Sequence, residues 1–235
     1  MNVDLQVPLE QHNTKQEEVI LTVSAMTHMP LFIDLSNKKV VVFGGGHIAE
    51  RKAKLFCNYS RTKVISRTFT PELKRMAGDG EIEIIKDDLT DIRRYFQGTF
   101  LVVPATNDPK LNALIADYAK TRKTLFNQVD VVGDVIVPSI ISSNEITLGI
   151  TTLGKSIASA KFLKTRIEEI LDEFSSMCRL QEEIRFMLKR MIKNQQERKQ
   201  MLYRILSDEE VWFGLSQSYD DGLKAALDIV NEKPQ

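Results

Sequence analysis

Short apolar runs alternate with amphipathic stretches along residues 31–129. Runs of β-branched residues are typical of buried strands, whereas apolar residues three or four positions apart are typical of helices packed on a sheet. The pattern predicts strands at Val40–Phe43, Lys63–Ser66, Ile82–Lys86, Phe100–Val103 and Leu125–Val129. It predicts helices between them at Ile48–Phe56, Pro71–Ala77, Leu89–Phe96 and Pro109–Arg122. This order predicts an α/β fold with a Rossmann-like, doubly wound parallel sheet.

The pattern changes after Gly133. The segment "DVIVPSIISSNEITLGITTLGKS" holds β-branched runs on either side of Ser-Ser-Asn-Glu, which predicts a two-stranded ribbon. Because an isolated ribbon is marginally stable, we expect a small β-rich unit that a symmetric dimer buries. From Ser159 onward the chain predicts a helical unit, in which Ser207 and Glu210 have capping-box spacing. Its apolar stripe is formed by Leu180, Ile184, Met187, Leu188, Met191 and Ile192, extended by Leu202 and Ile205.

Composition narrows the class of protein mainly by exclusion. The 235 residues carry a formal net charge of +0, which suggests no attraction to nucleic acid or to a membrane surface. Two cysteines and three scattered histidines predict neither a disulfide framework nor a metal site. The chain has no apolar stretch of membrane-spanning length and no signal-peptide pattern, so we expect a cytoplasmic protein.

A turn with three glycines follows the first predicted strand, in "VVVFGGGHIAERKAKLF". Gly44, Gly46 and Ala49 fit the pattern G-x-G-x-x-G/A at a strand-to-helix junction. In such a turn the first glycine permits the tight bend and the second lets the backbone approach a pyrophosphate. The small third residue allows close helix packing. The pattern favours a dinucleotide site, and the alternative is a glycine-rich turn without a ligand.

The end of the second predicted strand bears on the choice of dinucleotide. An acidic residue about 20 positions after the glycines would bind the ribose hydroxyls of NAD. Here the strand ends in "VISRTF", with Ser66 and Arg67 and no carboxylate before Glu72. A serine and an arginine could accommodate the 2′-phosphate of NADP, so these residues leave both cofactors open; the further alternative is a solvated Arg67.

Six ordered motifs carry a resemblance to a known family. They are "HMPLFIDL", "GGGHIAERKA", "PATNDPKLNALI", "FNQVD", "VIVPSIISSNEITLGITTLGKS" and "ERKQMLYRIL". Together they resemble the precorrin-2 dehydrogenase and sirohydrochlorin ferrochelatase family, which also forms the N-terminal module of siroheme synthase. The resemblance implies oxidation of precorrin-2 to sirohydrochlorin in siroheme (porphyrin-type tetrapyrrole) biosynthesis, with NAD as hydride acceptor. Some members of the family also insert iron or cobalt into the product. From the ribbon unit at Val135 to Ser156 we expect a homodimer.

The resemblance implies roles for particular residues. Its dinucleotide loop corresponds to Gly44, Gly45, Gly46, His47 and Ile48, and its other cofactor contacts fall on Arg67, Thr68, Ala105, Thr106 and Asn107. The aspartate that family members use for dehydrogenation and chelation is Asp130. In the S-x-G-K-S motif, Thr152 replaces the usual serine, and Lys155 and Ser156 are the expected substrate-binding residues. The usual "SPALA" reads "SIASA" here.

Asp130 ends an apolar run at the carboxyl end of a predicted strand, where open α/β sheets place their ligands. A carboxylate there could remove the proton that hydride loss leaves on a tetrapyrrole. From position alone, an aspartate capping a turn is an equal alternative; the family motif favours the catalytic role.

The helical region carries a local excess of positive charge. Between Arg179 and Arg204 lie eight lysines or arginines and three glutamates. Such a run is usually a solvated face. A wall that binds the carboxylates of precorrin-2 is the second interpretation.

These observations predict four segments: an N-terminal extension (1–28), an NAD-binding Rossmann domain (29–134), a dimerisation unit (135–160) and a helical C-terminal domain (161–235). The predicted activity is NAD-dependent precorrin-2 dehydrogenation. The alternatives are a bifunctional dehydrogenase and ferrochelatase, and a non-catalytic NAD-binding redox sensor.

Overall fold

The computed structural model of the chain describes residues 28–128 and 133–232. The chain divides into two compact units, Met1–Ile136 and Val137–Gln235. Each unit has its own hydrophobic core, and each is described by itself below.

The first unit is built on a five-stranded sheet with the order β3-β2-β1-β4-β5. Every neighbouring pair of strands is parallel. The strands are β1 (Lys39–Phe43), β2 (Arg61–Ser66), β3 (Glu83–Lys86), β4 (Thr99–Pro104) and β5 (Leu125–Phe126). The predicted Rossmann-like parallel sheet is therefore confirmed.

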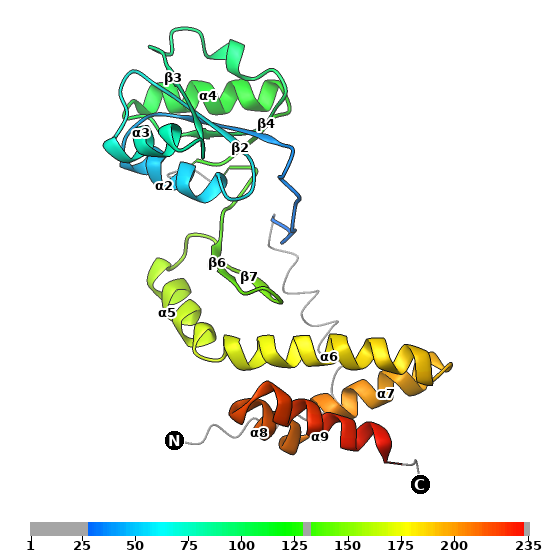
Figure 1. Cartoon of the computed structure of the whole chain (residues 1–235). Helices are drawn as coiled ribbons and strands as arrows, with labels where there is room; N and C mark the ends of the chain where they lie inside the picture. The colour runs from blue at the N-terminus through cyan, green and yellow to red at the C-terminus, as the bar shows by residue number, and fades with distance from the viewer. Residues whose placement is uncertain (1–27, 129–132, 233–235) are drawn as a thin grey trace. The chain divides into compact units, whose positions relative to one another are not determined.

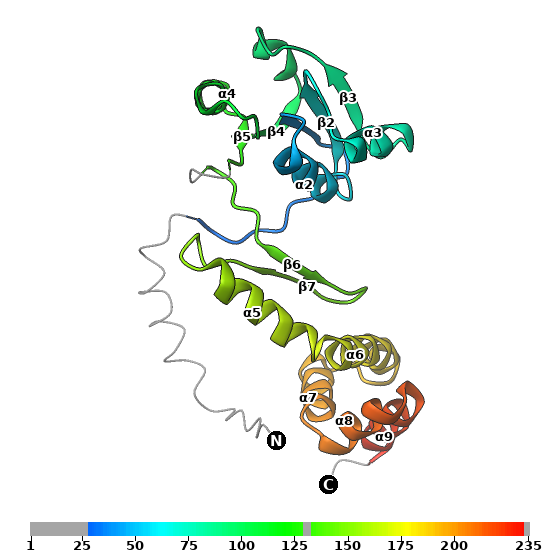
Figure 2. The same cartoon turned by 90° about the vertical axis from the view of Figure 1, so that its left-hand side faces the viewer.

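Helices cover both faces of this sheet. Helices α2 (His47–Phe56) and α3 (Pro71–Gly78) lie on one face, and α4 (Pro109–Thr121) lies on the other (Figures 1 and 2). The strand order reverses between β1 and β4, where the chain crosses from one half of the sheet to the other. In open α/β sheets the crevice at such a switch point, at the carboxyl ends of the strands, is where ligands bind.

The position of β1 at the centre of the sheet explains why its residues are apolar. Val40, Val41, Val42 and Phe43 are each at most 1% exposed, because helices cover both faces of β1. Phe43 stacks on Phe96, with ring centroids 6.0 Å apart. Burying each such side chain stabilises the fold by about 1.5–3 kcal/mol.

Two element predictions in this unit are wrong. The helix expected at Leu89–Phe96 is a short 3-10 helix, Ile92–Tyr95. Leu89 has φ +62° and its N–H donates to Asp87 Oδ1 at 2.6 Å, so a turn replaces the first helical turn. The last strand ends at Phe126, although Asn127 N still donates to Val102 O of β4 at 3.0 Å.

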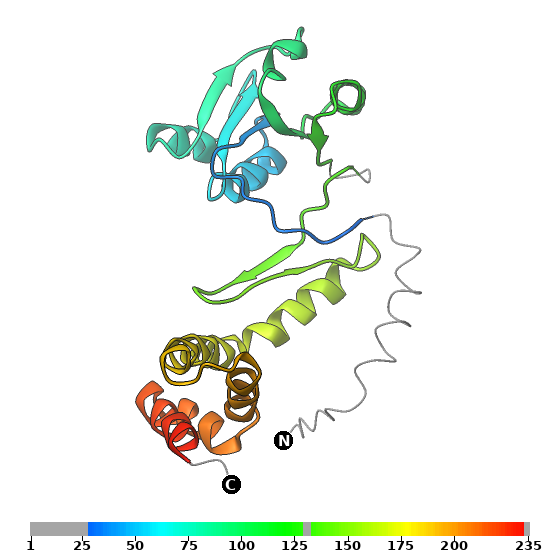
Figure 3. The same cartoon turned by 90° about the vertical axis from the view of Figure 1, so that its right-hand side faces the viewer.

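The second unit begins with the predicted ribbon. Strands β6 (Ser139–Ser142) and β7 (Thr147–Ile150) pair antiparallel, with Ile141 opposite Leu148. Helix α5 (Ile157–Glu168) packs along both strands (Figure 3). The remaining helices are α6 (Leu171–Met191), α7 (Gln195–Leu206), α8 (Glu209–Gln217) and α9 (Tyr219–Asn231). Within the described residues, no helix combines the length and apolarity that crossing a membrane requires.

The apolar stripe of the helical region forms a core. Leu180, Ile184 and Leu188 on α6 are fully buried together with Ile205 of α7, whereas Met191 at the end of α6 is 60% exposed. The predicted capping box is wrong. The cap of α8 is Asp208, whose Oδ1 accepts the N–H groups of Glu210 and Val211, because Ser207 instead closes α7.

Candidate cofactor site and active site

Backbone hydrogen bonds hold three loops together at the carboxyl edge of the sheet. Gly44 N donates to Ile65 O (2.9 Å), which ties the loop after β1 to strand β2. Ala105 N donates to Phe43 O (2.8 Å), and Thr70 N donates to Gly45 O (3.0 Å). The loops that follow β1, β2 and β4 therefore meet at the switch point, and they carry the cofactor residues predicted in this unit.

The three glycines of the loop differ in what surrounds them. Gly44 has φ +124°, and a Cβ there would lie 2.2 Å from Ala105 O. A Cβ on Gly45 would lie 1.8 Å from Thr68 O. A Cβ on Gly46 would meet nothing within 4 Å. The first two glycines thus let the loops approach one another, and the third leaves open space beside the backbone.

That open space adjoins the first turn of α2. Gly46 is the N-cap and supplies no side-chain cap, so no side chain occupies the position beside the first N–H groups of α2. These groups and the helix dipole favour a phosphate. The His47 side chain is 93% exposed, which leaves its backbone as the group nearest the turn. The residues present therefore fit the pyrophosphate of a dinucleotide.

The loop after β4 is locked by a residue that sequence analysis missed. Asn112 of α4 accepts from Thr106 N (3.0 Å) and Thr106 Oγ1 (2.7 Å), and its Nδ2 donates to Thr106 O (3.0 Å). Ala105 is buried and Asn107 is exposed on either side of this lock. The available signal was the segment "TNDPKLN", in which Asp108 caps α4 and Asn112 lies in its first turn.

The loop after β2 places Arg67 and Thr68 on the surface. The sequence showed no acid near Arg67 before Glu72, but Asp88, which follows β3, lies close enough to interact with Arg67 electrostatically. The pKa of Asp88 lies below its ordinary value, chiefly because the Thr90 N–H and hydroxyl bind the carboxylate, with Arg67 adding a smaller effect. Sequence analysis missed this acid because it lies one strand further along.

Polar contacts also involve Asn127, Gly133 and Val135, which follow β5 along the chain. Lys52 Nζ on α2 donates to Asn127 Oδ1 at 2.7 Å, and Asn127 Nδ2 donates to Val135 O at 2.8 Å. His28 Nε2 lies 3.0 Å from Gly133 O. Burial lowers the pKa of Lys52 below its ordinary value, and the nearby charge of Arg51 adds to this. Asp130, the predicted catalytic residue, lies outside the described residues.

Lys155 and Ser156, the predicted substrate-binding residues, belong to the second unit. Ser156 is the N-cap of α5, and its Oγ accepts from Ser159 N at 3.1 Å. Its backbone N–H donates to Thr152 Oγ1 at 3.0 Å. Thr152, which replaces the family's usual serine, therefore supplies the hydroxyl that holds this turn. Lys155 is exposed beside it.

Comparison with known proteins agrees with this geometry. Residues 31–139 match NAD_binding_7, a family model for NAD(P)-binding proteins. The chain is 40% identical over 209 residues to the precorrin-2 dehydrogenase of Methanosarcina barkeri strain Fusaro, and the match covers 86% of this chain and 93% of that protein. It is 24% identical to the siroheme synthase of Salmonella dublin over 89% of this chain, and it spans about half (46%) of that protein.

A solved structure shows the same fold. The precorrin-2 dehydrogenase SirC superposes with a TM-score of 0.67 at 22% identity, covering 86% of this chain and all (100%) of that one. The parallel sheet, the glycine loop at its switch point and the matched family model define a nicotinamide-dinucleotide-binding Rossmann protein. The 40% identity over most of both chains goes further. This chain belongs to the precorrin-2 dehydrogenase family of oxidoreductases.

Proposed function

We propose that this protein oxidises precorrin-2 to sirohydrochlorin, with NAD as the hydride acceptor. The observation that carries the proposal is the 40% identity to a precorrin-2 dehydrogenase over 93% of that protein. The loop at the switch point supports it, because the space beside Gly46 is open within 4 Å of a Cβ built there and adjoins the N–H groups that begin α2.

The residues divide into those that hold the dinucleotide and one that moves a proton. The N–H groups that begin α2 bind the pyrophosphate beside Gly46, and Thr106, held by Asn112, lines the crevice. Bound NAD supplies the acceptor for a hydride. Precorrin-2 thereby loses one hydride and one proton, and Asp130 takes that proton and returns it to water. Lys155 and Ser156 contribute to binding of the substrate.

NAD rather than NADP is the proposed cofactor. Arg67 is the cation that would bind a 2′-phosphate, and the Asp88 carboxylate already interacts with Arg67 electrostatically. This carboxylate offsets part of the positive charge and would repel the phosphate. We expect a higher kcat/KM with NAD. Asp88→Asn should then narrow the preference for NAD, whereas Asp91→Asn, which removes the carboxylate paired with Arg93, should leave it unchanged.

A homodimer in the cytoplasm is the proposed form. Two groups of apolar side chains are exposed in the single chain: Met29, Leu31 and Phe32 in the first unit, and Ile157 and Phe162 on α5. Exposed apolar surface of this kind is typical of association sites. Sedimentation at micromolar concentration should give a dimer, and a fully active monomer would contradict this part of the proposal.

A second activity is favoured by the match to siroheme synthase. We propose insertion of iron into sirohydrochlorin as the second candidate, with Asp130 accepting the pyrrole N–H protons.

The experiment that tests the main proposal is anaerobic incubation with precorrin-2 and NAD. We expect NADH absorbance to rise in step with the sirohydrochlorin spectrum, one equivalent of each. A folded protein that binds NAD and forms no NADH with precorrin-2 would show that the proposal is wrong. Adding iron(II) after completion then tests the second candidate separately.

A further inference from the structure

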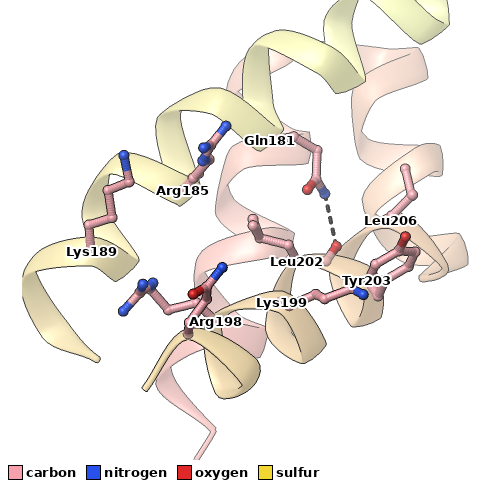
Figure 4. Close-up of a pocket in the computed structure, with 9 residues that line it drawn as sticks. Gln181, Arg185, Lys189, Arg198, Lys199, Leu202, Tyr203 and Leu206 are labelled. Atoms are coloured by element: carbon pink, nitrogen blue, oxygen red, sulfur yellow. Dashed lines mark hydrogen bonds between the residues drawn. The ribbon is translucent and has the colours of Figure 1, made fainter. Parts of the chain in front are cut away.

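A basic pocket lies between α6 and α7 in the second unit (Figure 4). Its volume of about 570 Å³ falls within the range of small-molecule sites. Four cationic side chains line it: Arg185, Lys189, Arg198 and Lys199. No residue that forms the cofactor site described above belongs to this pocket.

Helical spacing brings these cations together. Gln181, Arg185 and Lys189 recur every four residues and share one face of α6. Arg198 and Lys199 lie on α7, on the face that also carries Leu202. The core residues of α6 point elsewhere, since Leu180, Ile184 and Leu188 are fully buried against the other helices. The basic face is therefore a separate surface of the helix pair.

This positive charge is not neutralised within the chain. No carboxylate lines the pocket, and none of the four cations forms an ion pair with any residue in the described ranges. Arg204, which lies on α7 outside the pocket, does pair with a carboxylate, that of Glu232. Like charges gathered without counter-ions repel one another, and such clusters attract anions.

Two hydrogen bonds from Arg198 fix its position in the pocket. Its Nη1 donates to Ile192 O and Lys193 O, both at 2.7 Å, where α6 ends. No contact within the described residues uses its Nη2 or Nε, so these donors remain for a ligand. Gln181 Nε2 donates to Leu202 O at 3.1 Å and ties α6 to α7, as the dashed line in Figure 4 shows. Arg198 and Gln181 are therefore held in place before a ligand arrives, which lowers the cost of ordering these two side chains on binding.

The pocket also has an apolar side. Leu202, Tyr203 and Leu206 line it from α7, and Tyr203 is 53% exposed. An aromatic ring and two leucines beside a row of cations suit a ligand with a flat apolar body and acidic groups at its edge. A simple inorganic anion would leave this apolar side unused.

We propose that the α6–α7 pocket is a second binding site for a carboxylate-bearing tetrapyrrole ring. The cations bind the carboxylates at its edge, and Tyr203 and the leucines contact the ring. The choice of a tetrapyrrole rests on the proposed function, because that function supplies a carboxylate-rich macrocycle. The pocket gives the excess of positive charge between Arg179 and Arg204 a specific role.

The test measures binding of uroporphyrin, a stable porphyrin with two carboxylates on each pyrrole ring, by fluorescence titration and equilibrium dialysis. The full chain is used without NAD. We expect Arg185→Gln combined with Lys199→Gln to raise the Kd of one site by at least about tenfold, since two cations that would bind carboxylates are lost. The matched control is Arg190→Gln, because Arg190 lies on α6 but stacks over Phe186 outside the pocket. This control should bind like wild type.

Two outcomes would overturn the inference. One is equal binding by the double variant and the control. The other is binding of a mixed-sequence DNA duplex as tight as that of uroporphyrin and equally reduced in the double variant, which would indicate a nucleic-acid surface. The assay is independent of turnover. An inactive wild type that still loses uroporphyrin binding in the double variant would overturn only the proposed function, and an active enzyme with unchanged binding would overturn only this inference.

Discussion

Lys52 and Asn127 are 75 positions apart in sequence, and the Lys52 Nζ donates to Asn127 Oδ1 at 2.7 Å. The amide of Asn127 also donates to Val135 O, and Val135 N donates to Phe126 O at 3.2 Å. One buried side chain thus joins helix α2 to both ends of the segment that carries Asp130. Helix α2 and the backbone at Val135 are therefore linked through the single amide of Asn127.

This link predicts a measurable coupling. Asn127→Ala leaves a partly buried ammonium and a backbone carbonyl without their partner, so we expect a loss of about 1–3 kcal/mol in the free energy of unfolding. Lys52→Met should cost less, because it removes the charge together with its need for an acceptor. The double variant should lose less than the two single losses added together, which urea denaturation of all three variants would reveal. Strict additivity would mean that the two side chains act independently.

The glycine loop predicts that a substitution at Gly46 can weaken NAD binding without lowering the stability of the protein. Gly46→Asp should fold normally, because φ is −89°, the Cβ position is open and aspartate is a good N-cap. Its carboxylate would occupy the space where the pyrophosphate approaches, so the Kd for NAD should rise by more than about tenfold. Calorimetric titration measures the affinity and thermal unfolding measures the stability.

Two variants serve as controls for that prediction. Gly46→Ser adds a neutral cap of similar size, and we expect it to lose less affinity than the aspartate. Gly44→Ala should instead lower stability, by about 1–3 kcal/mol, because φ is +124° and the new Cβ would meet Ala105 O. Unchanged NAD affinity in folded Gly46→Asp would refute the phosphate-loop assignment.

Local patterns were sufficient to predict the sheet. The buried run Val40–Phe43 and the amphipathic stretch Pro109–Arg122 both reflect patterns within a few residues, and both elements formed where they were expected. The helix expected at Leu89–Phe96 failed for a reason visible only in three dimensions. The carboxylate of Asp87 binds Leu89 N, and Tyr95 OH donates to the same carboxylate at 2.7 Å.

Motifs were sufficient to predict the residues of the candidate site, but not the residues that hold its loops or interact with them. Gly44 and Thr106 lie in recognisable loops, whereas Lys52, Asn112 and Asp88 act through partners that no periodic pattern connects to them. Their side chains are ordinary for an exposed helix or a turn when the sequence is considered alone. Only the fold shows which buried acceptor or backbone group each of them meets.

An acidic network on the surface of the first unit predicts a pH dependence. The Glu72 carboxylate bonds to Arg75, and its second partner is Lys54. These contacts lower the pKa of Glu72 from 4.5 to about 2, with Arg75 the larger cause. A carboxylate whose pKa is lower in the folded than in the unfolded protein stabilises the fold fully at a pH above its unfolded-state pKa. That contribution is therefore present above pH 4.5 and is lost as the pH falls toward 2.

Glu72→Gln should accordingly reduce the loss of stability between pH 4.5 and 2. Amide hydrogen exchange in β1 measures this in the first unit directly. Arg75→Gln should remove at least as much of the dependence, because it removes the main partner of Glu72 and also the cation that pairs with Asp79 and Glu81. Salt should weaken the effect in wild type, since the carboxylate is exposed to solvent. An acid dependence identical in wild type and Glu72→Gln would count against this network.

Asp130 carries the last prediction. If its carboxylate removes the proton that accompanies hydride loss, Asp130→Asn retains the size of the side chain and its hydrogen-bonding capacity but provides no base. General-base catalysis contributes about 10²–10⁴-fold, so kcat should fall by about that factor while the Kd for NAD stays unchanged. Iron insertion, where present, should fall with it, because the same carboxylate would accept the pyrrole protons.

The matched control for this prediction is Asp134→Asn, four positions along the chain, which should keep wild-type activity. If Asp130 only caps a turn, asparagine would replace it well. Near-full activity of a folded, NAD-binding Asp130→Asn variant would therefore remove the support for its catalytic role.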